Sequence, residues 1–201
     1  MTAQSAPDRV MTLEEFEARF AGKRYEYVDG RAVPMGPEIS LPNGEVVVTP
    51  ETAGHGLLVS EIGAAVGEFV CEHKLGQVFA AGTGFWIKLN IRAADVAFIT
   101  AERMKAVKRG EWLPFPPDLA VEVISQYDKA QEIRDKAEEY MENGTRLLWI
   151  VYPERRIIDV HRSGQPIVKH AAGDRLDGGD VLPGFSIPVE ELFAPLDTLG
   201  E

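Results

Sequence analysis

Cysteine is almost absent from the sequence, which has only Cys71 among its 201 residues. One thiol excludes an intramolecular disulfide framework and a zinc site built from several cysteines, which fits a reducing compartment. Long apolar runs are missing too. No segment approaches about 18 uninterrupted apolar residues, and residues 1–9 lack the apolar core of a signal peptide. The sequence therefore predicts a soluble cytoplasmic protein that does not span a membrane.

Basic residues are scarce. Lys and Arg number 21 against 32 Asp and Glu, which gives a net charge of −11. A broad nucleic-acid surface needs clustered Lys and Arg to replace the counterions of the phosphates, so this balance argues against one. The single local basic run comprises Arg103, Lys105, Lys108 and Arg109. It could contact a phosphate backbone, but a solvated surface is the simpler interpretation.

Apolar residues make up 45% of the chain, enough to fill a sizeable core. Thr12 to Glu15 fits a capping box that opens a short helix, and apolar residues at three- and four-residue steps from Leu58 to Val70 predict a long one. Turn residues Asp29-Gly30, Asn43-Gly44 and Ser163-Gly164 predict β-hairpins toward both ends of the chain. Residues 84–89 are expected to form one strand, Asp128 to cap a helix that ends at Asn143, and residues 180–193 to form a loop and a short closing helix. Residues 12–193 are thus expected to form one α/β domain, after a flexible lead-in (residues 1–11) and before a tail (residues 194–201).

The run Leu119-Ala-Val-Glu-Val-Ile-Ser125 predicts a buried strand with one carboxylate, Glu122, at its centre. Burying an ionised carboxylate costs several kcal/mol unless a cation or hydrogen bonds compensate. Glu122 must therefore be neutral, paired or bound to a metal. This requirement makes Glu122 the first candidate for a functional residue.

A second carboxylate, Asp95, begins the preceding core strand, and Lys136 lies on the helix expected over residues 128–143. Mg²⁺ prefers a few carboxylate oxygens, which two neighbouring strands can supply, and the Val123 main-chain carbonyl could add a ligand. A lysine nearby could stabilise charge on a scissile phosphate, or orient or deprotonate the attacking water. The alternatives are that Asp95 is a cap and that Lys136 pairs with Glu132 on the helix surface.

Two further candidates are weaker. His55, at the start of the long helix, could bond a scissile phosphate or a metal-bound water, but a helix cap or structural donor is the common role of a lone histidine there. Glu26 lies beside tyrosines in the first hairpin, where it is either a supporting acid of the site or one partner of a cross-strand surface pair. Among the tryptophans, Trp112 is the best candidate for an exposed aromatic that stacks on bases, because Trp86 and Trp149 lie in apolar strands.

In their order and spacing, several segments together resemble the bacterial Uma-two family of restriction-endonuclease-like proteins, over about residues 12–193. These segments are Tyr25-Glu-Tyr-Val-Asp-Gly30, His55, Arg92-Ala-Ala-Asp-Val-Ala-Phe98, Ala120-Val-Glu-Val-Ile-Ser125, Asp135-Lys-Ala-Glu-Glu-Tyr140, Asn143-Gly144, Leu148-Trp-Ile-Val-Tyr-Pro153 and Leu182-Pro-Gly-Phe185.

The resemblance implies a PD-(D/E)XK nuclease fold, a mixed β-sheet flanked by helices, with metal-dependent phosphodiester hydrolysis. Asp95 and Glu122 match the motif carboxylates. The usual lysine two positions after the glutamate is Ile124 here, and Lys136 on the following helix matches the family's lysine instead. The proline usual before the aspartate is Ala94.

The resulting prediction is an endonuclease that hydrolyses DNA with water activated by Mg²⁺ or Mn²⁺ at Asp95, Glu122 and the Val123 carbonyl. Lys136 is the expected catalytic cation, with His55 and Glu26 in secondary roles. By analogy with nucleases that cut two strands, a homodimer is expected. Two alternatives remain open: a non-catalytic interaction or regulatory module that kept the nuclease fold, favoured by the acidic composition, and a hydrolase of small phosphoesters.

Overall fold

The computed structural model describes residues 10–200. Its elements in chain order are α1 (Leu13–Phe20), β1 (Tyr25–Val28), β2 (Arg31–Pro34), β3 (Glu38–Ser40), β4 (Val46–Val48), α2 (Ala53–His73), β5 (Gly76–Ala80), β6 (Phe85–Ile87), β7 (Asn90–Arg92), β8 (Val96–Thr100), α3 (Ala101–Met104), β9 (Leu119–Val123), α4 (Ala130–Glu142), β10 (Leu147–Tyr152), β11 (Ile157–Arg162), β12 (Val168–His170), β13 (Arg175–Gly178), β14 (Leu182–Pro188) and α5 (Val189–Phe193), with 3₁₀ turns η1 (Pro153–Arg155) and η2 (Ala194–Thr198).

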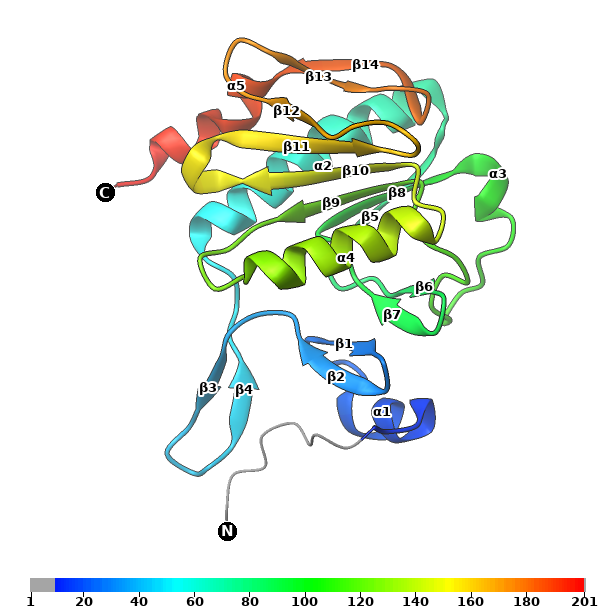
Figure 1. Ribbon diagram of the computed structural model, residues 1–201, viewed down its shortest axis with the longest axis vertical. Helices are drawn as coiled ribbons and strands as arrows, with labels where there is room; N and C mark the ends of the chain where they lie inside the picture. The colour runs from blue at the N-terminus through cyan, green and yellow to red at the C-terminus, as the bar shows by residue number, and fades with distance from the viewer. Residues whose placement is uncertain (1–9, 201) are drawn as a thin grey trace.

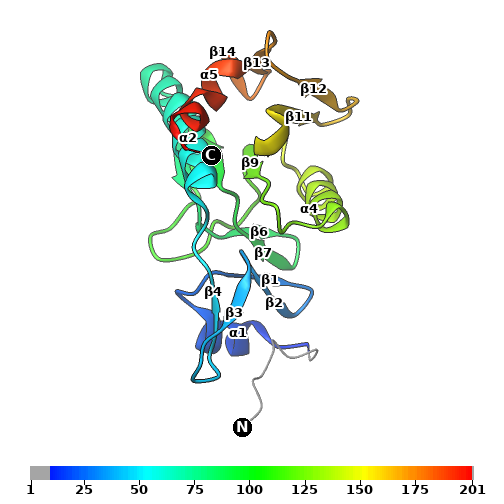
Figure 2. The same cartoon turned by 90° about the vertical axis from the view of Figure 1, so that its left-hand side faces the viewer.

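The main sheet has six strands in the order β12-β11-β10-β9-β8-β5. Only β9 and β10 pair in parallel, so the sheet is mixed. Helix α4 crosses one face and α2 covers the other (Figures 1 and 2). This is the predicted α/β architecture, a mixed sheet flanked by helices.

Alternation along β9 assigns its side chains to the two faces, because successive strand residues point to opposite sides. Leu119, Val121 and Val123 pack in the core that α2 covers. Ala120 packs with Ala137 and Tyr140 of α4 in the other core. Glu122 alternates with Val121 and Val123, so it points to the α4 side of the sheet.

A smaller sheet, in the order β2-β1-β7-β6, lies with α1 below the main sheet in Figure 1. The predicted capping box is present: the Thr12 hydroxyl accepts from the Glu15 amide, and the Glu15 carboxylate accepts from the Thr12 amide. The Asp29-Gly30 hairpin is confirmed, with positive φ at both residues. Met11, in the expected lead-in, is buried and donates its amide to Gly30; residues 1–9 lie outside the described part.

The remaining hairpins join β3 to β4, β11 to β12 and β13 to β14. The first projects away from the rest of the molecule (Figure 1). The third was missed: residues 180–193 were expected to be a loop and a short closing helix, and the helix is present as α5 but the loop is largely β14. A further error concerns residues 84–89, expected to be one strand: β6 turns at Lys88, which has φ of 60°, and returns as β7.

Helix α4 begins at Ala130 with Lys129 as a cap residue that makes no side-chain cap bond. The prediction that Asp128 caps it is therefore wrong. The Asp128 carboxylate instead accepts from the Ser125 amide at 2.6 Å, which closes the turn between β9 and the helix. Among residues 10–200, no helix combines the length and the apolar character that a membrane crossing requires.

Candidate functional site

Pairing of β8 with β9 brings the two acidic positions to the same end of the main sheet. Val96 lies opposite Val121, and the Asp95 amide donates to the Val121 carbonyl at 3.0 Å. The Asp95 carboxylate oxygen Oδ2 accepts from the Val123 amide at 2.8 Å. Asp95 is thus tied at both its backbone and its side chain to the strand that carries Glu122.

The Glu122 carboxylate is the least compensated group of the site. Oε2 accepts from Lys136 Nζ at 2.9 Å, whereas Oε1 is buried and has no hydrogen-bond partner among the described residues. The pKa of Glu122 is raised to about 7, because burial and the charges of Asp95 and Glu26 raise it by more than Lys136 lowers it. The buried Tyr140 hydroxyl also lacks a partner in hydrogen-bonding geometry, and burial and the charge of Glu122 raise its pKa.

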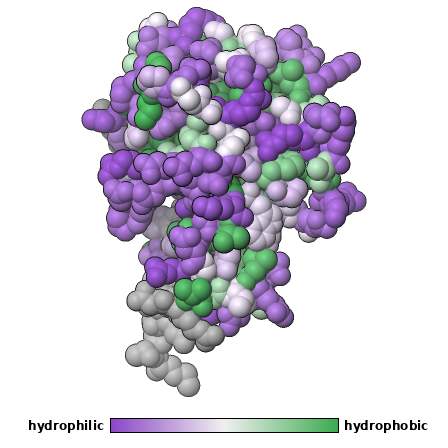
Figure 3. All heavy atoms as spheres, turned by 45° about the vertical axis from the view of Figure 1, so that its right-hand side comes forward, coloured by the Kyte–Doolittle hydropathy of each residue, from purple (hydrophilic) through white to green (hydrophobic). Residues whose placement is uncertain are grey.

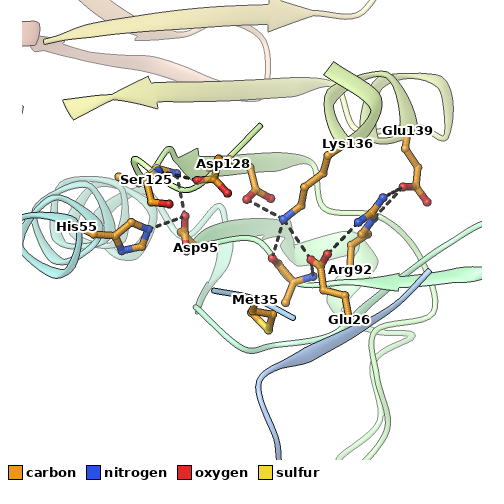
Figure 4. Close-up of polar contacts among 12 residues, drawn as sticks. Glu26, Met35, His55, Arg92, Asp95, Ser125, Asp128, Lys136 and Glu139 are labelled. Carbon is orange, nitrogen blue, oxygen red and sulfur yellow. Dashed lines mark hydrogen bonds and ion pairs between the residues drawn. The ribbon is translucent and has the colours of Figure 1, made fainter. Parts of the chain in front are cut away.

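Lys136 joins two carboxylates from different parts of the fold. Its Nζ lies 2.9 Å from Glu122 Oε2 and 3.1 Å from Glu26 Oε1, and 3.5 Å from the Ala93 carbonyl. Figure 4 shows the Lys136 side chain reaching from α4 into this cluster. Burial lowers the pKa of Lys136, but Glu122 and Glu26 outweigh that effect and raise it above its ordinary value. Lys136 is therefore a fixed positive charge.

Arg92 holds Glu26 on the other side. Its guanidinium donates to Glu26 Oε2 at 2.9 Å and to Glu139 of α4, while Glu26 Oε1 accepts from the Ala93 amide at 2.8 Å. Burial alone would raise the pKa of Glu26, but Lys136 and Arg92 together lower it. Glu26 is 5% exposed and is not a surface pair across the hairpin. It belongs to a buried charge network that links β1, β7 and α4.

His55 lies in the first turn of α2 and faces Asp95. Its Nε2 is 3.4 Å from Asp95 Oδ2. Burial lowers the pKa of His55, but the contacts with Asp95 and Val123, together with the charge of Glu51, raise it on balance. The His55 ring does not cap the helix, because the Thr52 side chain is the cap and accepts a hydrogen bond from the His55 backbone amide.

A cavity of about 550 Å³ opens onto one side of this cluster. Its lining includes Glu26, His55, Arg92 and Asp95. Glu122 and Lys136 do not line it and lie behind those residues. A ligand in the cavity would therefore meet Asp95 and His55 first.

Comparison with known protein families shows which family the chain belongs to. The family model described as "Putative restriction endonuclease" (Uma2) matches residues 34–190, which is more than half of the chain. The chain belongs to the Uma2 family. No protein of curated function is significantly similar to it in sequence.

A solved structure has the same fold as this Uma2 chain. It is the crystal structure of "a putative nuclease belonging to DUF820" from Anabaena variabilis ATCC 29413, with a TM-score of 0.73 over 92% of this chain and 98% of the other. The two sequences are 16% identical, so the similarity concerns the fold alone.

The donor atoms of this Uma2 chain suit a hard divalent cation. Among residues 10–200, no group of three or more His, Cys, Asp and Glu forms a metal cluster. Mg²⁺ does not need one, because it keeps several waters and binds through one or two carboxylates. The unpartnered Oε1 of Glu122 is a buried anionic oxygen of this kind, close to Asp95. Asp95 and Glu122 therefore fit such an ion, and the Val123 carbonyl as a further ligand stays a prediction.

The structure brings together all the side chains singled out in the sequence of this Uma2 chain: Glu26, His55, Asp95, Glu122 and Lys136. Their roles remain predictions. Two members of the cluster, Arg92 and Glu139, were not anticipated. The sequence feature that could have identified Arg92 as a buried charge is its position among the apolar residues Ile91, Ala93 and Ala94.

The basic run of the Uma2 chain is remote from this cluster. It begins in α3, which follows the end of β8 opposite Asp95 (Figure 1). Three of its four charges are locally matched: Arg103 pairs with Asp118 at 2.9 Å, Lys105 with Glu102, and Lys108 with Glu111 at 3.7 Å. The run is therefore a structural and surface feature.

Proposed function

We propose that the chain is a nuclease that hydrolyses phosphodiester bonds of DNA, with Mg²⁺ or Mn²⁺ held by Asp95 and Glu122 and with Lys136 as the catalytic cation. The observation that carries this proposal is the contact between Lys136 Nζ and Glu122 Oε2 at 2.9 Å, beside Asp95. It supplies the two carboxylates and one amine of the nuclease motif, although the amine comes from α4. Membership of a family described as restriction endonucleases supports the same reaction.

The bound metal would supply a Lewis acid that polarises a phosphate oxygen and lowers the pKa of a water. Lys136 stabilises the negative charge that develops on the phosphate, and its raised pKa makes it unsuited to act as a base. Glu26 holds the Lys136 ammonium in place from the side opposite Glu122. His55 orients the Asp95 carboxylate through the contact at Oδ2.

The cluster favours a catalytic protein over a non-catalytic module of the same fold. A buried carboxylate oxygen without a partner is costly, since an unsatisfied buried charged group destabilises by at least about 1–3 kcal/mol. The joint presence of Asp95, Glu122 and Lys136 around that oxygen is what a catalytic site needs and what a scaffold does not. Cleavage of both strands of a duplex would need two such sites, which is the reason to expect a homodimer.

The test is cleavage of supercoiled plasmid and of circular single-stranded DNA with Mn²⁺, Mg²⁺ or EDTA. Wild type is compared with Asp95→Asn, Glu122→Gln and Lys136→Met at equal folded concentration. Lys129→Met is the matched control, because Lys129 is a 77% exposed side chain just before the same helix. We expect metal-dependent cleavage by wild type and by the control, and a loss of at least about 100-fold in each site variant.

Equal cleavage by wild type and all variants would identify a contaminating nuclease and refute the assignment. Absence of cleavage with intact folding would favour the non-catalytic module. Cleavage of small phosphodiesters but not of nucleic acid would favour the small-phosphoester hydrolase.

A further inference from the structure

The cavity in front of Asp95 has two chemically different walls. One carries the ionised groups of the site. The other is aromatic and comprises Phe16, Phe20, Tyr25 and Trp112. A nucleotide has the same division, with an apolar base at one end and a charged phosphate at the other. This cavity therefore suits one nucleotide unit better than a ligand of uniform polarity.

Trp112 is held in place from two sides. Its indole makes an edge contact with Trp86, with ring centroids 6.0 Å apart and planes at 74°. It also packs on the backbone of Gly84, where an added Cβ would lie 2.6 Å from Trp112 Cδ1. The Trp112 side chain is only half-buried and lines the cavity, whereas Trp86 does not line it. Trp112 is a rigid aromatic surface next to the site.

Phe20 and Tyr25 belong to the same hydrophobic cluster as Trp112 and extend this wall. Their rings pack at 4.7 Å, and the Lys23 ammonium lies 5.9 Å from the Phe20 ring. Lys23 is exposed and belongs to the cavity lining, so it places a positive charge at the aromatic side. Aromatic rings with an adjacent cation are typical of proteins that bind single-stranded nucleic acid.

Size and charge argue against entry of an intact duplex. A volume of about 550 Å³ lies in the range of small-ligand pockets, and a base stacked inside a duplex enters such a pocket only at the cost of unstacking and unpairing, which an unpaired base avoids. Binding along a duplex also depends on many phosphate contacts, but three of the four charges of the basic run are paired with local carboxylates. The face in Figure 3 is predominantly hydrophilic with scattered hydrophobic residues, and offers no extended apolar surface.

We propose that the aromatic wall, with Trp112 as its main surface, stacks an unpaired base while the adjoining phosphate faces Asp95, so that the substrate is single-stranded nucleic acid. This inference rests on the proposed nuclease function. It specifies the substrate class of that site. DNA and RNA strands share this chemistry, and separate arms of the test distinguish them.

The test measures binding without cleavage. In an Asp95→Asn background with EDTA, fluorescence anisotropy gives Kd for single-stranded DNA, single-stranded RNA and duplex DNA of equal length. We expect at least one single strand to bind about tenfold or more tightly than the duplex. Adding Trp112→Leu should weaken that binding about 5- to 150-fold, the range of one base-stacking contact. Phe69→Leu, the matched control, should retain it, because Phe69 is half-buried against His73 and Phe185 and does not line the cavity.

A second measurement does not depend on a Trp112 variant that folds. Oligonucleotides of the same length with abasic sites keep the phosphates and lose the bases. They should bind the Asp95→Asn protein at least about tenfold less tightly than the intact strand. Equal binding of abasic and intact strands, or of duplex and single strand, would overturn the inference.

Failure of this inference and failure of the nuclease assignment give different results. Cleavage of duplex and single strand at equal rates, with no effect of Trp112→Leu, would refute the stacking wall and keep the nuclease. Preferential binding of single strands through Trp112 without cleavage of any substrate would support the wall and refute the nuclease.

Discussion

Lys136 Nζ lies 2.9 Å from Glu122 Oε2 although the two residues come from different elements, the helix α4 and the strand β9. The turn after β9 makes this contact possible, because it lets α4 cross the face of the sheet to which Glu122 points. The usual nuclease lysine would project from β9 itself. Here the lysine beside Glu122 comes from the helix α4 instead, and the position two residues after Glu122 is occupied by Ile124.

Lys136→Met should destabilise the protein as well as inactivate it. Removing one member of a buried charge cluster typically costs about 3–5 kcal/mol, because the remaining charges lose their partner. Here those charges are Glu122 and Glu26, and the 23% exposure of the Lys136 side chain favours the lower end. Urea denaturation at pH 7 measures the change. Lys129→Met should change stability by less than about 1 kcal/mol, because its pair with Glu132 is exposed.

Adding Glu122→Gln to Lys136→Met should recover part of the lost stability, since one buried carboxylate is then neutral. Activity should remain absent. If the double variant is as unstable as the single variant, the ion pair does not explain the loss, and the packing of the lysine stem does.

The stabilising effect of Glu26 should depend on pH. Its pKa in the folded state is lower than the ordinary 4.5, so folding favours the ionised form. Stability from Glu26 is then complete above the unfolded-state pKa and is lost as pH falls through the folded-state pKa. The difference in unfolding free energy between wild type and Glu26→Gln should be constant above about pH 6 and shrink below pH 4.5.

Chemical denaturation between pH 7 and pH 3.5 gives this difference. Glu132→Gln, at an exposed position of α4, is the control for the general effect of losing one carboxylate. If the difference in unfolding free energy between wild type and Glu26→Gln stays constant over the whole pH range, Glu26 is not held ionised by Arg92 and Lys136.

Much of the site was predictable because strand and helix periods fix where side chains point. A carboxylate in the middle of an apolar strand had to be neutral, paired or bound to a metal, which singled out Glu122. The order of the segments in the family placed Lys136 near it. The packing of α4 across the sheet, on which its contact depends, is a tertiary fact and had no local signal.

The unanticipated part of the cluster depends on a turn without the usual turn residues. Arg92 reaches Glu26 and Glu139 only because the chain reverses at Lys88, a lysine with φ of 60°, and returns as β7. Without Gly or Asn at that position, the sequence favoured one continuous strand. The β13–β14 hairpin was missed for a related reason, since its polar, Gly-rich sequence is typical of a loop.

Two glycines should respond in opposite ways to replacement by alanine. Gly67 lies inside α2, where an added Cβ would meet nothing within 4 Å, so close packing does not explain this glycine. Gly67→Ala should stabilise the protein by about 0.5–1 kcal/mol through helix propensity. At Gly76 an added Cβ would lie 1.9 Å from the Ile99 carbonyl oxygen, so Gly76→Ala should destabilise strongly. Thermal unfolding of both variants tests the sign, and destabilisation by Gly67→Ala would contradict the prediction.

Metal binding at Asp95 and Glu122 should be visible as a gain in stability that one substitution removes. At a concentration of about 100 times Kd, a ligand that binds only the folded state stabilises it by about 2.7 kcal/mol, several degrees in Tm for a chain of this size. The readout is the shift in Tm between EDTA and saturating Mg²⁺ or Mn²⁺. The Tm itself is not the readout, because Asp95→Asn also relieves repulsion with Glu122 and so changes the stability of the metal-free protein.

Asp95→Asn should abolish the shift in Tm. Asp128→Asn should keep it, since that exposed carboxylate bonds the Ser125 amide nearby without joining the cluster. A shift of equal size in Asp95→Asn and wild type would place the ion elsewhere and remove the basis for a metal at this site.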